Sequence, residues 1–380
     1  MYRINQFRVK GFRRLFDIDI SMQPFTVIIG NNAVGKTTFL DAFSILSASA
    51  SGNLNTKLSQ LGGVSNILTR GRSEEVNFSL DMEIPNYEPL KYSLNIGSFG
   101  TGYSINSETL VQQNPEYAKP FLYIDSHKQA IRYFEPDEKK IVPVDWDHNY
   151  METSLSQVPK MFRTSEELRR ILATAKKYHV LDVSSQAPIK LPQQMKPSTN
   201  PGLNGEDIIS YLYYLRETSK DKFEAITDSL KAAFPGFEEL GFPPIAAGML
   251  TMTWKDENFT KPLYLHELSE GVLRFLWLVS LLQSSDLSAV TMIDEPDVSL
   301  HPELMNILAG LMREASARTQ LIIATHSDRF VRFIKPEELM VFDLDEDGCT
   351  TINRGDSFDL EKWICEYTLD ELWMMGCLKT

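Results

Sequence analysis

The sequence predicts an α/β fold in which a mixed sheet carries an antiparallel β lobe and a helical insertion. Three short apolar runs support this, because residues 25–29, 289–293 and 321–324 each have the pattern of a buried strand. The first run leads into a glycine-rich loop and an apolar helix, and an amphipathic helix separates the other two. That strand–helix–strand order requires a right-handed crossover, so the last two strands should be parallel and end on the same edge of the sheet.

The loop after the first strand has the pattern G-x-x-x-x-G-K-[ST] in its required strand–loop–helix context. Its glycines allow backbone N–H groups to surround phosphate oxygens at a helix N-terminus. Lys36 can reach the β- and γ-phosphates, and the Thr37 hydroxyl can bind Mg²⁺. The predicted nucleotide-binding residues of this loop are Gly30, Asn31, Asn32, Gly35, Lys36, Thr37 and Thr38.

An acidic doublet, Asp294-Glu295, ends the second strand. A carboxylate in that position can hold Mg²⁺, and the next one can orient and deprotonate an attacking water. We therefore predict that Asp294 binds the metal and that Glu295 is the general base. The third strand ends in Thr325-His326-Ser327. His326 could then hydrogen-bond the γ-phosphate, a prediction that depends on its placement, since a lone histidine is more often structural.

Leu268-Ser269-Glu270-Gly271 precedes a helix that is apolar nearly all round and should be buried. Ser269 has the position of an N-cap. A capped N-terminus that offers a serine hydroxyl and a glycine amide can bind an anion, although these four residues alone would also fit an ordinary helix cap.

Together these motifs resemble the ABC ATPases, in the form found in the SMC-like, RecF-like and OLD-like branch. In chain order they are the phosphate loop Gly30–Thr37, the signature Leu268–Gly271, the doublet in Met292–Pro296, a D-loop Asp297–Pro302 and the switch histidine His326. The N-terminal FRVKGFRRLFDIDI also resembles the opening strands of that branch. The resemblance implies ATP and Mg²⁺ as cofactors and a homodimer that sandwiches two ATP molecules. In such a dimer, Ser269 and Gly271 contact the γ-phosphate held by Lys36 of the second copy.

Two positions depart from the usual signature L-S-G-G-Q. Glu270 replaces one of the two glycines, and Val272 replaces the glutamine. The glutamine of the Q-loop, a further metal ligand, is assigned to Gln157, with Gln60 and Gln129 as alternatives.

Roughly 230 residues separate the phosphate loop from the signature, far more than a single crossover helix needs. Their first part has the pattern of short antiparallel strands, near residues 76–84, 91–96, 103–110 and 131–134. Helices are expected near 166–178, 206–217 and 222–234, with a flexible or irregular stretch over 184–201. Sustained heptads of a long coiled coil do not occur.

We accordingly divide the chain into four parts. These are an N-terminal ATPase lobe (1–155), a helical insertion (156–260), a C-terminal ATPase lobe (261–345) and a tail (346–380). The tail is too short for the nuclease domain fused to OLD-type proteins. Its apolar residues near 367–375 should pack on their own domain, with docking of a partner as the alternative.

Composition narrows the class of protein. The apolar (43%) and charged (23%) fractions are ordinary for a folded domain, and no apolar run reaches the roughly 20 residues of a membrane span. No signal peptide or disulfide framework is expected, so a cytoplasmic protein is predicted. The net charge of −13 disfavours a broad DNA-binding surface. Local basic patches remain candidates, with solvated charges as the simpler interpretation, at Arg13–Arg14, Arg70–Arg72, Arg169–Arg170 and Lys176–Lys177.

The resemblance favours a stand-alone, slowly hydrolysing ATPase that senses or gates, with its output delivered by a separate effector. ATPase subunits of bacterial anti-phage systems work with a nuclease or toxin in this way. The alternative is a RecF- or SMC-like ATPase of DNA repair or processing. A nucleotide-binding subunit of a transporter is disfavoured by the long insertion and by the absence of membrane-coupling features.

Overall fold

The computed structural model describes residues 3–85, 88–113, 120–128, 130–135, 140–357, 369 and 371. Its strands are β1 (Arg3–Phe12), β2 (Leu15–Ser21), β3 (Phe25–Gly30), β4 (Glu75–Glu83), β5 (Leu90–Phe99), β6 (Gly102–Gln112), β7 (Phe121–His127), β8 (Arg132–Glu135), β9 (Lys140–Pro143), β10 (Lys176–Tyr178), β11 (Gln193–Gln194), β12 (Phe237–Gly241), β13 (Pro244–Ile245), β14 (Met249–Leu250), β15 (Thr253–Asp256), β16 (Leu263–Tyr264), β17 (Val290–Asp294), β18 (Gln320–Ala324), β19 (Leu339–Leu344) and β20 (Thr350–Arg354). Its α-helices are α1 (Lys36–Ala50), α2 (Leu54–Gln60), α3 (Val64–Ile67), α4 (Arg163–Ala173), α5 (Ile208–Thr218), α6 (Lys220–Ala233), α7 (Glu270–Leu282), α8 (Pro302–Ala315) and α9 (Asp328–Val331).

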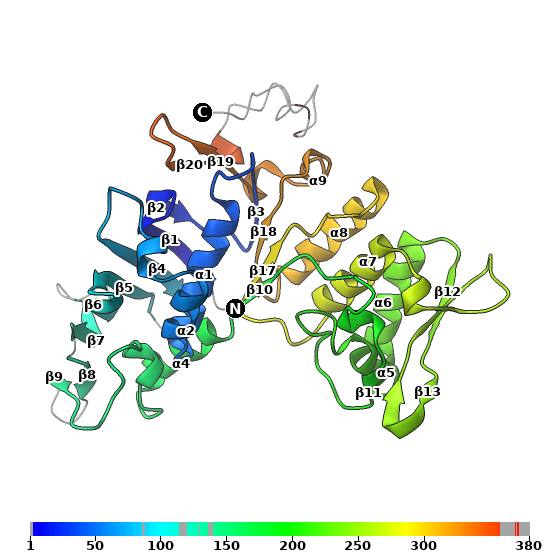
Figure 1. Cartoon of the computed structure of the whole chain (residues 1–380), viewed down its shortest axis with the longest axis horizontal. Coiled ribbons are helices and arrows are strands. Elements are labelled where there is room, and N and C mark those ends of the chain that lie inside the picture. The colour runs from blue at the N-terminus through cyan, green and yellow to red at the C-terminus, as the bar shows by residue number, and fades with distance from the viewer. Residues whose placement is uncertain are drawn as a thin grey trace.

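Two sheets organise the described chain. One is an antiparallel sheet of order β2-β1-β4-β5-β6-β7-β8-β9. The other has the order β10-β17-β18-β3-β19-β20, with β20 alone antiparallel to its neighbour. In Figure 1 this second sheet lies centrally, with α1 and the antiparallel sheet on one side and α5 to α8 on the other. The predicted α/β class, its mixed sheet and its antiparallel lobe are confirmed.

The central strands are buried on both faces, and their side chains alternate between two cores. In β3, Val27 and Ile29 pack with the helical side, whereas Ile28 packs with α1 and the antiparallel sheet. In β18, Ile323 faces the first core and Ile322 the second. Continuous apolar runs are therefore required here, which is the pattern of a parallel sheet covered on both faces.

The antiparallel lobe follows the expected alternation. In β4 the buried residues Val76, Phe78, Leu80 and Met82 occupy every second position. The predicted strands near 76–84, 91–96, 103–110 and 131–134 correspond to β4, β5, β6 and β8. Their apolar face covers Phe39 and Phe43 of α1. The ring of Phe43 stacks on Phe7 of β1, and the ring of Phe39 meets Phe7 edge to face.

One predicted helix is partly wrong. Residues 166–178 were expected to be helical throughout, but α4 ends at Ala173 and Lys176–Tyr178 form β10. This short strand pairs in parallel with β17, at the edge of the central sheet. Its three residues carry no pattern of their own, so the pairing partner, distant in sequence, decides the conformation.

The other predicted helices correspond to α5, α6 and α8. The stretch 184–201 is mostly irregular, but it is packed in place: Ala187 and Ile189 are buried in the core beside α5 and α7.

The four-part division of the chain stays a prediction. Within the range predicted as the helical insertion, α4 packs against α1 and β10 joins the central sheet. Within the range predicted as the tail, β20 joins the same sheet. The apolar segment 367–375 lies outside the described residues, except for Leu369, which is buried, and Glu371, which is exposed.

Candidate functional site

Four parallel strands end along one edge of the central sheet, in the spatial order β10, β17, β18 and β3. At these ends the chain presents, in the same order, His179, then Asp294 with Glu295, then His326, and finally the Gly30–Thr37 loop. The sheet therefore assembles the phosphate loop, the acidic doublet and the switch histidine, which lie far apart in the sequence. A sheet edge of this kind is where open α/β folds bind their ligands.

Two glycines shape the phosphate loop. Gly30 has φ of +151°, and a Cβ there would lie 2.3 Å from the carbonyl oxygen of Phe342. Gly35 has φ of +110°, and its Cβ would lie 2.6 Å from Thr350 Oγ1. No other residue fits either position without displacing β19 or β20. The Thr350 hydroxyl also donates to the Val34 carbonyl at 2.7 Å, which fixes the loop against β20.

Lys36 is 7% exposed, and its ammonium group turns back onto the loop. It donates to the carbonyl oxygens of Gly30 at 2.7 Å and Asn31 at 2.9 Å. Burial lowers the pKa of Lys36, and attraction to Glu295 and Asp294 opposes that shift. A phosphate oxygen would be a stronger, charge-assisted partner than these neutral carbonyls. The loop can therefore exchange its own contacts for those of a phosphate.

The remaining predicted loop residues have their side chains available for a ligand. Asn31, Asn32 and Thr37 are exposed and Thr38 is partly buried. None of these four side chains hydrogen-bonds to another described residue. The Thr37 hydroxyl can therefore turn toward a metal without breaking an existing contact.

Asp294 offers a carboxylate oxygen that has no protein partner. Its Oδ1 is buried and makes no hydrogen bond within the described chain, while its Oδ2 lies 3.6 Å from Lys177 Nζ. Lys177 Nζ lies 2.9 Å from Asp41 Oδ1, and Arg13 Nη1 lies 2.9 Å from Asp41 Oδ2. An unsatisfied buried carboxylate oxygen is costly, and a hard cation such as Mg²⁺ is a fitting partner for it. The residues present therefore fit the magnesium ion predicted at Asp294.

Glu295 and His326 form a contact across neighbouring strand ends. Glu295 has φ of +53°, which is uncommon for a residue with a side chain. Its N–H donates to the carbonyl of Ala324 at 2.7 Å, and its Oε2 lies 2.7 Å from His326 Nδ1. The backbone contact fixes the turn and the imidazole fixes the carboxylate. The predicted base and the predicted switch histidine thus lie together.

Helix α7, which follows the signature residues, contacts the D-loop of the same chain. Ser269 caps α7, since its hydroxyl accepts from the Val272 N–H at 3.4 Å. Arg274 Nη1 donates to Ser299 Oγ at 2.5 Å, and Ser299 has φ of +63°. No hydrogen bond or ion pair within the described residues joins Ser269 or Gly271 to the phosphate loop. These two residues are therefore not part of the strand-edge group in one chain.

Gln157 is occupied elsewhere. Its amide nitrogen lies within hydrogen-bonding distance of the carbonyls of Asn149, Glu152 and Thr153, at 3.0, 3.3 and 3.3 Å, and its Oε1 accepts from the Asn149 N–H at 2.7 Å. To act as the predicted metal ligand, it would have to give up these bonds. Of the alternatives, Gln60 ends α2 and Gln129 lies outside the described residues.

Sequence reasoning missed Lys177 and His179. We counted Lys177 among candidate surface cations, yet its side chain is only 7% exposed and lies between Asp41 and Asp294. His179 lies directly beyond β10. Desolvation of its ring lowers the pKa of His179, the charge of Lys177 lowers that pKa further, and Asp294 opposes the shift. The local signal was weak, because β10 has only three residues, Lys176–Tyr178, and the expected helix covered all of them.

Gly271 is predicted to be intolerant of alanine. A Cβ there would lie 2.6 Å from the Ser299 carbonyl oxygen, a backbone atom, so the D-loop would have to shift. We expect Gly271→Ala to lower the free energy of unfolding by about 1–3 kcal/mol. The matched control is Gly310→Ala in α8, where the added Cβ meets nothing within 4 Å. It should stabilise the protein by about 0.5–1 kcal/mol. Urea denaturation measures both, and equal effects would contradict the close approach.

Lys177→Met is predicted to destabilise the fold. Among the described residues, it leaves Asp41 in an ion pair with Arg13 alone, and Asp294 in none. Breaking a buried ion pair by removing one partner costs about 3–5 kcal/mol, and the lower end applies because Arg13 remains. Lys176→Met, a neighbouring lysine that is only partly buried, is the control. If both variants unfold at the same urea concentration as the wild type, the ion pairs of Lys177 contribute nothing to the free energy of unfolding.

Residues 25–332 match the family described as "AAA domain, putative AbiEii toxin, Type IV TA system". The chain belongs to this AAA domain family. The match spans the residues predicted as phosphate loop, signature, acidic doublet and switch histidine. No curated protein sequence matches the chain.

Solved structures agree on the fold. An SMC head bound to the C-winged helix domain of ScpA aligns with a TM-score of 0.57 and 16% identity, covering 92% of this chain and 97% of that one. An Smc head domain with an extended coiled coil, bound to the C-terminal domain of ScpA from Pyrococcus furiosus, has a TM-score of 0.56 and 13% identity, covering 99% of both chains. The AAA domain thus has the SMC-head type of ATPase fold.

Two further observations concern the described part of this AAA domain. No helix there is long and apolar enough to cross a membrane. Nor does that part contain a group of three or more His, Cys, Asp or Glu side chains able to hold a metal by themselves. A magnesium ion bound by Asp294 and Thr37 would therefore need further oxygen ligands from nucleotide and water, as Mg²⁺ commonly does.

Proposed function

We propose that this AAA domain protein binds and slowly hydrolyses ATP, and that two copies close on two ATP molecules to gate a separate effector. The observation that carries the proposal is the assembly of a phosphate loop, an unpartnered Asp294 oxygen and the Glu295–His326 pair at one sheet edge. This arrangement supplies phosphate binding, metal binding and a base within one site.

The reaction would use this chain's own groups in distinct roles. The loop amides and the Lys36 ammonium would bind the phosphates of ATP. Mg²⁺, held by Asp294 and Thr37, would neutralise charge on the β- and γ-phosphates. Glu295 would take a proton from the attacking water, whose oxygen bonds the γ-phosphorus while the bond to the ADP oxygen breaks. His326 would keep Glu295 in place and contact the γ-phosphate. The products are ADP and phosphate.

The second copy is proposed from the signature residues. Ser269 and the Gly271 amide stand at the exposed N-terminus of α7, a helix end that favours anions. Within the described residues, no hydrogen bond or ion pair joins them to the phosphate loop of their own chain. A partner's γ-phosphate is the anion we propose for them, which would make dimerisation depend on ATP.

An effector partner is the next step of the proposal. The family description names an AbiEii toxin and a type IV toxin–antitoxin system, and the similar SMC head structures are bound to domains of ScpA. We propose that this protein likewise works with another protein, a nuclease or toxin in anti-phage defence. As an ATP-consuming protein it would act in the cytoplasm.

The alternative function is ATP-driven DNA repair or processing of the RecF or SMC kind. The likeness to SMC heads favours it. The net charge of −13 weighs against it, and most of the basic residues named as candidate patches are paired. For example, Arg13 pairs with Asp41, Arg72 with Asp347 and Arg169 with Glu166.

Affinity purification from the native host separates these functions. Tagged Glu295→Gln protein with ATP should retain an effector that Lys36→Ala protein does not, because only the first can hold the closed state. Duplex DNA should not raise the ATPase rate of the wild type. A DNA-stimulated rate, with no partner retained by Glu295→Gln, would favour the alternative.

A further inference from the structure

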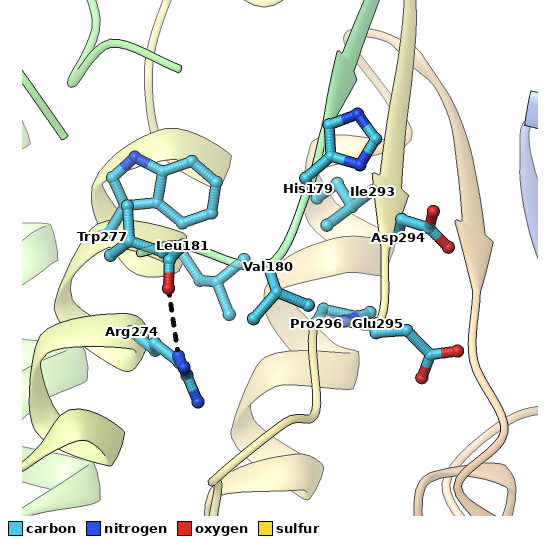
Figure 2. A pocket seen from close by; sticks show the side chains of 10 residues that line it. His179, Val180, Leu181, Arg274, Trp277, Ile293, Asp294, Glu295 and Pro296 are labelled. Carbon is cyan, nitrogen blue, oxygen red and sulfur yellow. Dashed lines mark hydrogen bonds between the residues drawn. The ribbon is translucent and has the colours of Figure 1, made fainter. Parts of the chain in front are cut away.

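His179 occupies a defined place beside the acidic doublet. β10 pairs in parallel with β17, with Lys177 opposite Met292 and Tyr178 opposite Ile293. The next residues along the two strands are His179 and Asp294, so the register sets them side by side. Figure 2 shows the two side chains at adjacent strand ends.

His179 lines the same pocket as both carboxylates of the acidic doublet. One narrow pocket is lined by His179, Asp294 and Glu295, together with Arg274 and Trp277 of α7. Arg274 is already engaged, since its Nε donates to the Leu181 carbonyl at 3.3 Å, the contact dashed in Figure 2. The His179 ring makes no hydrogen bond with another described residue. Within the described part of the chain, it is therefore an exposed polar side chain with no hydrogen-bond partner, at the edge of this pocket.

The strand edge explains why a side chain at this position matters. Moving along the edge from the phosphate loop, one meets His326, then the doublet, then His179. A metal ion bound by Asp294 would thus have His179 on the side of the doublet opposite to the phosphate loop. Gln157 was predicted as a metal ligand, but its side-chain amide is hydrogen-bonded to backbone groups within residues 149–153.

We propose that His179 is a positioning residue of the metal–nucleotide site, whose ring nitrogen accepts a hydrogen bond from a water bound to the Mg²⁺ held by Asp294. Mg²⁺ prefers oxygen ligands and keeps several waters, so an imidazole acts on it through water. The inference rests on the proposed ATP site. His179 would act on the metal through a water, whereas Gln157 was predicted to bind the metal directly.

Loss of an outer-shell partner of a bound metal typically costs 10- to 100-fold in metal affinity. His179→Ala should therefore raise the Mg²⁺ concentration for half-maximal binding of a fluorescent ATP analogue about 10-fold. His179→Gln should stay within about 3-fold of the wild type, because an amide oxygen can accept the same hydrogen bond. Binding of the analogue in EDTA should be equal in all variants, since the phosphate loop is unchanged.

The control is His127→Ala, an exposed histidine of β7 in the antiparallel sheet, which should match the wild type. If His179→Ala keeps wild-type magnesium dependence, the inference is wrong. It is also wrong if His179→Ala weakens binding in EDTA as much as in Mg²⁺, since that marks a structural role. If the wild type itself shows no magnesium-dependent binding, the proposed ATP site fails and the role of His179 fails with it.

Discussion

Lys36→Ala is expected to abolish measurable ATP binding while leaving the fold intact. Among the described residues, the ammonium group donates only to carbonyls of its own loop. Its burial is unfavourable, as its lowered pKa indicates. Removing it should therefore change the stability of the unliganded protein little. Bound phosphates would lose their charge-assisted partner, and we expect affinity to fall at least about 100-fold, or about 2.7 kcal/mol. Isothermal titration with ATP and Mg²⁺ measures this.

The matched control for Lys36→Ala is Lys222→Ala, an exposed lysine of α6 on the helical side. It should bind ATP as the wild type does. Both variants should unfold at nearly the same urea concentration as the wild type. Retention of wild-type affinity by Lys36→Ala would remove the phosphate loop from the proposed site. Loss of affinity together with unfolding would instead assign Lys36 a structural role.

The parts of this fold that the sequence predicts are those with strong local patterns. The buried runs that became β3, β17 and β18 are continuous and apolar because both faces of the sheet are covered. The motifs at their ends then follow from topology, since parallel strands end on one edge. This is why Lys36, Asp294, Glu295 and His326 could be placed together from the sequence.

The parts that could not be predicted depend on distant partners. β10 has only three residues and is a strand because it pairs with β17. From the sequence alone, its two lysines were expected in the last turn of a helix, and His179 in solvent just after that helix. The burial of Lys177 depends on Asp41 and Asp294, which come from other segments. For Gln157 the opposite holds: local hydrogen bonds to residues 149–153 keep it from the metal position that analogy suggested.

Glu295→Gln is expected to produce a stable ATP-bound dimer. The amide keeps an oxygen that can accept from His326 Nδ1, now 2.7 Å from the carboxylate, so the turn at φ +53° should persist. It cannot take a proton from water, and loss of a general base costs about 100- to 10,000-fold in rate. Binding should be retained or improved, because a negative charge next to the γ-phosphate is removed. Bound ATP would therefore remain unhydrolysed long enough for two copies to form the closed dimer.

Size-exclusion chromatography coupled to light scattering tests this prediction, because it measures the molar mass in solution and one chain has a mass of 43.3 kDa. Glu295→Gln with ATP and Mg²⁺ should elute at twice that mass, and with ADP at the mass of one chain. Adding Lys36→Ala to Glu295→Gln should restore the mass of one chain, because ATP no longer binds. Adding Gly271→Ala should do the same, because the new Cβ displaces the D-loop from its place next to the signature. Glu257→Gln, an exposed carboxylate beyond β15, should behave as the wild type. A Glu295→Gln protein that stays monomeric in excess ATP and Mg²⁺ would exclude the shared site. ATP would then bind one chain alone, and Ser269 would be an ordinary helix cap.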